Sequence, residues 1–505
     1  MKKTRYSIWT IVLFVLTPLL FLLFMSRNSP LHNMNTREDI NCFLACGQYI
    51  LNGKIPYRDF FDHKGPIVYY LYAFCLLLWP KTFHGVYILE VVSGIAFCFI
   101  SRKTISLFVK SKSLPTITTI LVYISSVFTA NGDNGQFEQF CLPLLAYAIY
   151  LVAKYMKNKT LIKKSAFLMV GLCAGFIFWG KFTILVVYMI CIVALVIVSI
   201  LDKAYDQIRD MVIYGVIGFA IITAVVIVFF ASVGALDDLI SVYFIANSMQ
   251  YTSNVMMYPD HKYLSIAVSS VLGIILYTFG MSYAILLLVV ASNMKAHKDK
   301  RIHAIVGFAA MGYGLTVIGA CIGGYAFSYY FINVTSWYPI IFAIYFEYRK
   351  FLKGFLSKFA IITSCILFGA YGCAYASYFF EDTIERNEYE EFQKEAVDMM
   401  KETGHTNMCC LNFLEDGFYY QMGELPDRYY FTAASARRRE IVDSMMDGVY
   451  SGDIDYVFVH IPVYTDREIP YIEEIVSEAP LVEVDRFEYD DGAVIYMYEN
   501  LNANH

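Results

Sequence analysis

Charged residues are scarce in this chain. Only 16% of its 505 residues are Asp, Glu, Lys or Arg, and 58% are hydrophobic. A soluble domain averages about 25% charged and about 45–50% apolar residues. Several apolar runs also reach about 18 residues, the length that crosses a bilayer. The shortage of charge therefore excludes an ordinary soluble domain and predicts a polytopic α-helical membrane protein.

Several other signals are missing. No small-residue cleavage site follows the first apolar run, Ser7 to Met25, so we expect it to be retained as a span. Most of the 12 cysteines sit inside apolar runs, where they behave as small hydrophobes. Cys42 and Cys46 lie four apart, and we read neither metal-ligand spacing nor a disulfide framework in the cysteines. The C-terminal part has no phosphate-binding glycine loop and no nucleophile motif.

Basic residues are scarce in the C-terminal part. From residue 380 onward the chain has 9 Lys and Arg against 29 Asp and Glu, a net charge of −20. The part before it has 30 against 15, a net charge of +15. A nucleic acid partner needs a basic surface, so the acidic tail argues against one. We predict two domains, a membrane domain over 1–380 and an acidic α/β domain over 381–505.

The basic clusters predict the topology, because cytoplasmic loops carry an excess of Lys and Arg. They occur at 2–5, 102–112, 154–164, 203–209, 295–301 and 349–358. Placing all of them inside predicts about eleven spans, a cytoplasmic N-terminus and an extracytoplasmic tail in a plasma-membrane protein. The predicted spans are 7–25, 85–104, 114–131, 137–154, 164–180, 182–201, 211–232, 263–292, 303–321, 330–347 and 359–379.

Two further segments are predicted from their pattern. The apolar run Ile67–Trp79 is short, and we interpret it as a juxtamembrane or re-entrant helix of the first outer loop, 26–84, with a short span as the alternative. The tail alternates strand and helix patterns, which favours a parallel or mixed sheet. Its predicted strands are Met408–Phe413, Tyr456–His460 and Ala493–Tyr498, and its predicted helices are Glu388–Thr403, Arg437–Met446 and Tyr471–Glu478.

Against this apolar background, residues 37–66 are dense in charge. They read REDINCFLACGQYILNGKIPYRDFFDHKGP, with four acidic and four basic side chains. Ionisable groups beside a bilayer are costly and usually mark a substrate or ion path. Basic residues placed outside against the usual bias are what an anionic substrate requires.

This run resembles the first extracytoplasmic loop of bacterial GT-C glycosyltransferases of the family-39-like group, which includes protein O-mannosyltransferases and aminoarabinose transferases. The matching residues are Asp39, Gly53, Pro56, Tyr57, Asp59, Asp62, Lys64, Gly65 and Pro66. The resemblance implies a GT-C fold over about residues 1–380. It also implies sugar transfer from a polyprenyl-phosphate donor to a glycan, lipid or protein acceptor at the outer face.

An acceptor hydroxyl needs a general base, and a carboxylate is suited to that role. Asp39 matches the acidic position that plays this part in the family, with Glu38 as the second candidate. The family usually has Asp-Glu where this chain has Glu38–Asp39. The alternative is that Asp39 only caps a helix over Ile40–Leu51.

The leaving lipid phosphate needs cations or phenols beside it. Arg58 and Lys64 are the nearest candidates. The family also places a lysine at a turn like that of Lys181, although a lysine there can simply snorkel to the interface. Tyr329 and Tyr330 stand where relatives carry aromatic residues, and an interfacial aromatic belt is the alternative.

The remaining candidates are carboxylates. Asp133 and Glu138 in the second outer loop match a family position that faces the first loop, and Asp59 and Asp62 join them as acceptor- or metal-positioning groups. Two or three carboxylates suit Mg²⁺ or Mn²⁺, so Asp39 with Glu138 is a possible metal site. The alternative for Glu138 is a favourable charge at a helix N-terminus.

Our main interpretation is a glycosyltransferase that inverts the anomeric configuration of the transferred sugar. Two other functions are alternatives to it. A transporter or flippase for lipid-linked saccharides needs mid-membrane charges and paired repeats, and we find neither. A non-catalytic membrane scaffold has no need for the clustered charges of the first loop.

Overall fold

The computed structural model describes residues 6–32, 35, 38–80, 82–130, 134–251, 261–277, 299–348, 366, 388–413, 417–423, 428–432, 439–461, 469–490 and 492–503. The chain forms two compact units. Unit 1 comprises Met1–Leu31, Val86–Phe229 and Val255–Ala376, and unit 2 comprises His32–Gly85, Phe230–Asn254 and Ser377–His505. The predicted domain boundary near residue 380 falls outside the described ranges and stays a prediction.

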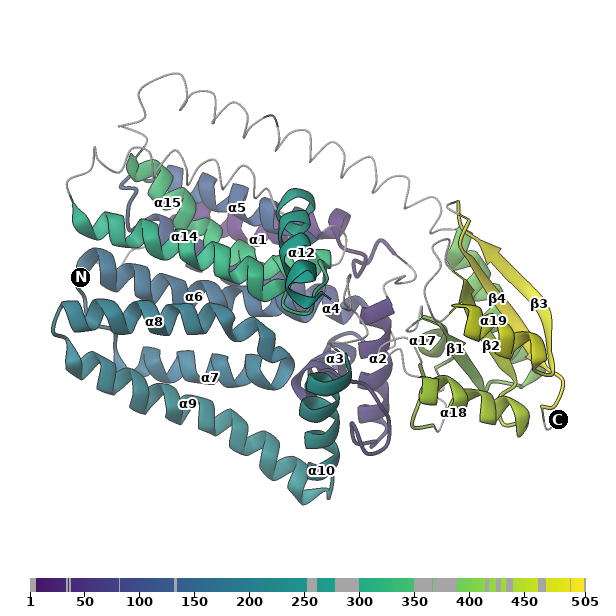
Figure 1. Ribbon diagram of the computed structural model, residues 1–505. Coiled ribbons are helices and arrows are strands. Elements are labelled where there is room, and N and C mark those ends of the chain that lie inside the picture. Colours follow the sequence, from purple (N-terminus) through teal and green to yellow (C-terminus); the bar gives the residue numbers. More distant parts are fainter. Residues whose placement is uncertain are drawn as a thin grey trace. The chain divides into compact units, whose positions relative to one another are not determined.

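Unit 1 is built from helices (Figure 1). They are α1 (Ile8–Met25), α4 (His84–Ile105), α5 (Leu114–Ala130), α6 (Phe137–Asn158), α7 (Lys164–Lys181), η1 (Phe182–Leu185), α8 (Val186–Leu201), α9 (Tyr205–Ser232), α12 (Lys262–Leu276), α14 (Lys300–Ala320), η4 (Ser328–Trp337) and α15 (Tyr338–Tyr348). Six stretches of the described chain are long and apolar enough to cross a membrane. They are α1, α4, α6, the run from α7 to α8, α9 and α14. The protein is therefore a multi-pass membrane protein.

The run from α7 to α8 covers two predicted spans, 164–180 and 182–201, that we expected to be separated by a turn at Lys181. It covers 38 residues, and the short 3₁₀ helix η1 interrupts it directly after Lys181. It thus forms two helices that meet at the predicted turn. Apart from residue 366, the predicted span at 359–379 lies outside the described residues, as does the second half of the one at 263–292.

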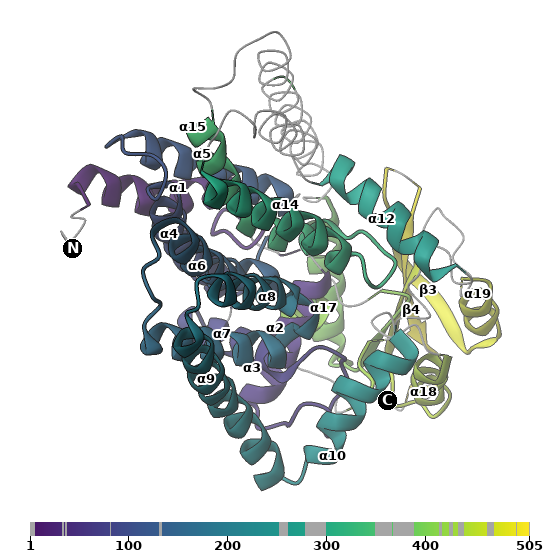
Figure 2. The same ribbon diagram turned by 60° about the vertical axis from the view of Figure 1, so that its left-hand side comes forward.

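Helix α6 is the centre of unit 1. It packs against α7, α8, α14 and η4. Of the residues in its most apolar 18-residue segment, 78% are buried inside the protein. The corresponding value for α9 is 11%, so most of that helix faces outward. Both ribbon views show α6 and α8 side by side (Figures 1 and 2). A protein-buried helix can carry polar side chains inward, and α6 is the helix that begins beside Glu138.

Helices α7 and α9 approach closely through glycine. A Cβ on Gly171 would lie 2.1 Å from the carbonyl oxygen of Gly215, and one on Gly218 would lie 2.2 Å from that of Leu168. Small residues allow such backbone contact between apolar helices, where dispersion rather than water drives association. This contact holds the first half of α7 against α9.

Unit 2 contains the charged first loop. Helix α2 (Glu38–Leu51) packs against α3 (Pro66–Leu78), and a Cβ on Gly47 would lie 2.8 Å from the backbone nitrogen of Ala73. With 13 residues, α3 is about 20 Å long, shorter than the hydrocarbon core of about 30 Å. This length favours the predicted juxtamembrane helix over a span. Helices α10 (Leu236–Leu239) and η2 (Ile240–Tyr251) complete this part.

The tail forms a four-stranded mixed sheet with strand order β1-β2-β4-β3. The strands are β1 (Met408–Leu411), β2 (Tyr456–Ile461), β3 (Leu481–Glu488) and β4 (Val494–Asn500), with β1 and β2 parallel and the other pairs antiparallel. A helix over 388–403, α17 (Phe418–Met422), α18 (Arg439–Tyr450) and α19 (Ile469–Glu478) accompany it. The sequence did not predict β3, because this edge strand is largely exposed and carries many charges.

The tail and the first loop belong to one unit. The backbone N–H of Phe61 donates to the carbonyl of Tyr429, 2.7 Å away. The ring centroid of Tyr49 lies 4.9 Å from that of Phe60 and 5.4 Å from that of Phe431. The tail therefore supports the charged loop directly, a contact that no sequence pattern indicated.

Candidate functional site

The turn that carries the PYRD sequence is organised by one carboxylate. Asp59 accepts from the backbone N–H of Ile55 at 2.6 Å and from Arg58 through two bonds of 2.9 Å. The pKa of Asp59 lies below its usual value, chiefly because Arg58 donates to it. Arg58 also donates to the carbonyl of Val233. These bonds hold Arg58 to the turn, and its role at the donor phosphate stays a prediction.

Tyr57 adopts a backbone conformation that tyrosine rarely takes. Its φ is +71°, in the left-handed region, and its side chain is buried. Such a conformation costs roughly 1–3 kcal/mol and persists only where surrounding contacts enforce it. The Tyr57 hydroxyl donates to the carbonyl of Lys64 at 2.6 Å, and the Tyr69 hydroxyl reaches the same oxygen at 3.1 Å. Two phenols thus fix the backbone at Lys64.

Asp62, His63 and Lys64 are consecutive in the loop, and their side chains lie in contact. We call these three residues the Asp62–His63–Lys64 relay. Asp62 lies 3.1 Å from Nδ1 of His63, and the Lys64 ammonium lies 3.1 Å from Nε2 of the same ring. Burial raises the pKa of Asp62, but the hydrogen bonds and charges of His63 and Lys64 outweigh it and lower the pKa overall. Burial and the charge of Lys64 lower the pKa of His63 below 6.5. At neutral pH we therefore expect a neutral imidazole between a carboxylate and an ammonium.

Asp39 lies in the first turn of α2. The helix begins at Glu38 rather than at Ile40, so Asp39 is inside the helix and not its cap. Its side chain is partly exposed, and its negative charge acts on both Cys42 and His63. The predicted base therefore lies within electrostatic reach of the Asp62–His63–Lys64 relay.

A second cluster lies in unit 1, where three predicted elements meet. The Lys181 ammonium at the end of α7 donates to Glu138 in the first turn of α6. It also lies 3.8 Å from the ring centroid of Tyr330 and 5.1 Å from that of Tyr329. Glu138 is 2% exposed and Lys181 18% exposed, so the ion pair is largely buried. A largely buried lysine that faces a carboxylate and two aromatic rings can receive a phosphate.

Sequence reasoning assigned no role to Glu90, and the structure gives it one. The side-chain amide of Asn28 donates to Glu90 Oε1 at 2.9 Å and to the carbonyl of Asn134 at 3.1 Å. Gly135 has a φ of +88° and packs against Asn28 and Glu90. This network ties α4 and the segment after α1 to the loop that enters α6, and so positions Glu138. The signal in the sequence was a lone glutamate within an apolar span.

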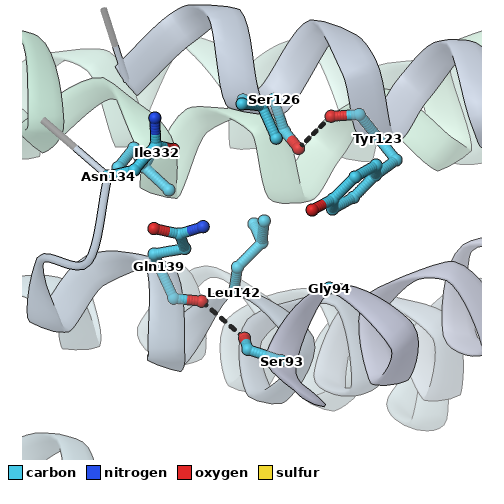
Figure 3. A pocket seen from close by; sticks show the side chains of 9 residues that line it. Ser93, Gly94, Tyr123, Ser126, Asn134, Gln139, Leu142 and Ile332 are labelled. Carbon is cyan, nitrogen blue, oxygen red and sulfur yellow. Dashed lines mark hydrogen bonds between the residues drawn. The ribbon is translucent and has the colours of Figure 1, made fainter. Parts of the chain in front are cut away.

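Unit 1 also contains a small cavity with both polar and apolar lining residues (Figure 3). Its lining includes Ser93, Tyr123, Asn134 and Gln139, and its volume is about 10 Å³. That volume is near the lower limit for one water molecule. This cavity is too small for a sugar, so we keep the two charged clusters as the candidate site.

The predictions for Asp133, for Glu38 and for a metal site are not tested by the described residues. Asp133 lies outside the described residues, as does the side chain of Glu38. The predicted metal site shared by Asp39 and Glu138 joins residues of both units and stays a prediction. A group that sequence reasoning missed offers metal-ligand atoms instead, namely Cys42, Cys46 and Asp62, all buried in unit 2.

The apolar helices form a multi-pass membrane domain, and a small mixed sheet lies in the C-terminal part of the chain. The chain is similar to ArnT from Cupriavidus metallidurans, whose apo crystal structure aligns with a TM-score of 0.58 at 10% sequence identity. The alignment covers 98% of this chain and 99% of that one. No protein-family model matches the chain, and no curated protein matches its sequence. The predicted fold is thus confirmed, and at this identity the likeness concerns the fold alone.

Proposed function

We propose that this protein is a membrane glycosyltransferase that moves a sugar from a polyprenyl-phosphate carrier to an acceptor hydroxyl at the outer membrane face. A shared fold does not by itself assign an activity, so the proposal must rest on a site. The observation that carries it is the buried Lys181 ammonium, held between Glu138 and the rings of Tyr329 and Tyr330.

Lys181 suits the leaving group of this reaction. When the bond between the anomeric carbon and the phosphate oxygen breaks, negative charge grows on the carrier phosphate. A fixed ammonium in a partly desolvated position stabilises that charge more strongly than one in water. Without donor, Glu138 neutralises Lys181, so the phosphate takes over a role that the carboxylate holds in the resting protein.

Asp39 serves as the general base in this proposal. Its carboxylate accepts the proton of the acceptor hydroxyl while the acceptor oxygen bonds to the anomeric carbon and the phosphate leaves from the opposite face. A single displacement of this kind inverts the anomeric configuration, as in inverting glycosidases with a sugar hydroxyl in place of water. The Lys64 ammonium, at one end of the Asp62–His63–Lys64 relay, supplies a positive charge in the same unit.

The test is transfer of radiolabelled sugar from a panel of synthetic polyprenyl-phosphate sugars by the purified protein, by Asp39→Asn and by Glu38→Gln, which changes the second candidate for the base. We expect donor-dependent release of polyprenyl phosphate that Asp39→Asn abolishes and Glu38→Gln retains. Equal release by wild type and Asp39→Asn contradicts Asp39 as the base. Donor binding without release, together with movement of the carrier across liposomes, contradicts the transferase and favours a flippase.

A further inference from the structure

One face of α2 carries two buried thiols. Asp39, Cys42 and Cys46 are spaced by three and four residues, so they follow one another along one side of the helix. Cys42 is 1% exposed and Cys46 is fully buried. The sequence alone gave no third ligand for these cysteines, because it lies 16 residues further on, in the loop after the PYRD turn.

That third ligand is Asp62. One oxygen of its carboxylate and the sulfur atoms of Cys42 and Cys46 all lie within 4.8 Å of one another. In a tetrahedral zinc site, with Zn–S bonds near 2.3 Å, two sulfur ligands lie about 3.8 Å apart. A shift of about 1 Å or less therefore brings these three atoms into coordination geometry.

The loop around Asp62 is held by other contacts. Its Oδ2 accepts from the Tyr69 hydroxyl at 3.0 Å, and its Oδ1 accepts from the backbone N–H of His63 at 2.7 Å. His63 Nδ1 lies 3.1 Å from Oδ1 as a third contact. A carboxylate offers about four lone-pair directions, so these three contacts leave one for a metal. Hydrogen bonds of this kind orient ligating groups and tune the metal they bind.

The charge of the group also fits a divalent ion. Two thiolates and one carboxylate carry three negative charges, and a divalent cation leaves a net charge of −1 beside it. The Lys64 ammonium lies one imidazole away, 3.1 Å from His63 Nε2, and can balance that charge. Thiolates select Zn²⁺ over Mg²⁺ or Mn²⁺, which prefer oxygen ligands.

We propose that Cys42, Cys46 and Asp62 form a zinc site that ties the second and third turns of α2 to the DHKG loop. Three protein ligands leave the fourth tetrahedral position to water or another oxygen donor. The bound ion fixes the loop that presents Lys64 relative to the helix that presents Asp39. The inference goes beyond the transfer reaction, because metal binding is measured on the resting protein.

The test uses the full chain, purified in detergent under reducing conditions and stripped with a chelator. After loading with Zn²⁺ and washing, we expect one equivalent of metal and an X-ray absorption spectrum with two sulfur neighbours at about 2.3 Å. After loading with Co²⁺ we expect thiolate-to-cobalt charge-transfer absorption. Both spectra are measured on the wild type, so they do not depend on whether a variant folds.

Variants then locate the ion. Cys42→Ser and Cys46→Ser are each expected to weaken Zn²⁺ binding at least about 100-fold, since loss of a mere supporting contact already costs roughly 10–100-fold. Cys75→Ser, which changes another buried cysteine of the same unit, is the matched control and is expected to retain binding. Less than stoichiometric zinc, a metal shell of only oxygen and nitrogen, or unchanged binding in both cysteine variants overturns the proposal.

Discussion

Lys181 donates to Glu138 across 43 residues of sequence, from the end of α7 to the first turn of α6. The two side chains were predicted for different tasks, one for the donor phosphate and one for the acceptor or a metal. Their pairing means that each neutralises the charge of the other. This relationship leads to two predictions.

Lys181→Met is expected to lower the rate of transfer by about 10²–10³-fold, the loss typical when one stabilising group for a developing anion is removed. Lys181→Arg keeps the charge but changes its shape, and we expect it to recover part of the rate. The measurement is release of polyprenyl phosphate under saturating donor. Lys159→Met, which removes a lysine paired with Asp202, is the control. Full activity in Lys181→Met would exclude this lysine from the reaction.

Glu138→Gln is expected to destabilise the protein, because it leaves the buried Lys181 charge without its carboxylate. Breaking one partner of a buried ion pair costs roughly 3–5 kcal/mol. The double variant Glu138→Gln/Lys181→Met removes both charges and is expected to unfold at a higher temperature than Glu138→Gln alone. Thermal unfolding of the four proteins in one detergent measures this coupling. Additive shifts would show that the pair does not stabilise the fold.

Tyr57→Phe removes the hydroxyl that donates to the Lys64 carbonyl but keeps the ring. We expect a stability loss of about 1 kcal/mol, the usual net value of one hydrogen bond. We also expect weaker donor binding, seen as a raised KM with a smaller change in kcat, because the backbone at Lys64 loses one of its two phenol contacts. Tyr450→Phe, at an exposed position of α18, is the control. An unchanged KM would separate this contact from substrate binding.

His63 predicts a pH dependence of stability. Its pKa in the folded protein lies below 6.5, so below that pH the unfolded chain binds a proton that the folded protein does not. The stability due to the neutral ring is therefore complete above pH 6.5 and is lost as the pH falls below it. Denaturant unfolding between about pH 5 and 7 should show this loss in the wild type and less of it in His63→Gln. Identical slopes in the two proteins would assign the dependence to other groups.

The sequence predicted helices and strands correctly where one physical signal, such as apolar run length, dominates. Apolar run length predicted a membrane protein, and the break after Lys181 was visible as one charge between two such runs. The strands β1, β2 and β4 were predicted within a few residues because they are buried and apolar. The edge strand β3 was missed because its exposed side chains follow no buried pattern.

For the site, the amino-acid types alone indicated which residues could act as a base or bind a phosphate. These are the carboxylates and cations of the first loop, Lys181 and the tyrosines of η4. Tertiary structure alone decided their partners. It paired Lys181 with Glu138, bound Glu90 to Asn28, and brought Asp62 to two cysteines of α2. The reason is that burial and local pattern are encoded in neighbouring residues, whereas these contacts join segments 16 to 62 residues apart, and only the packing of helices brings such segments together.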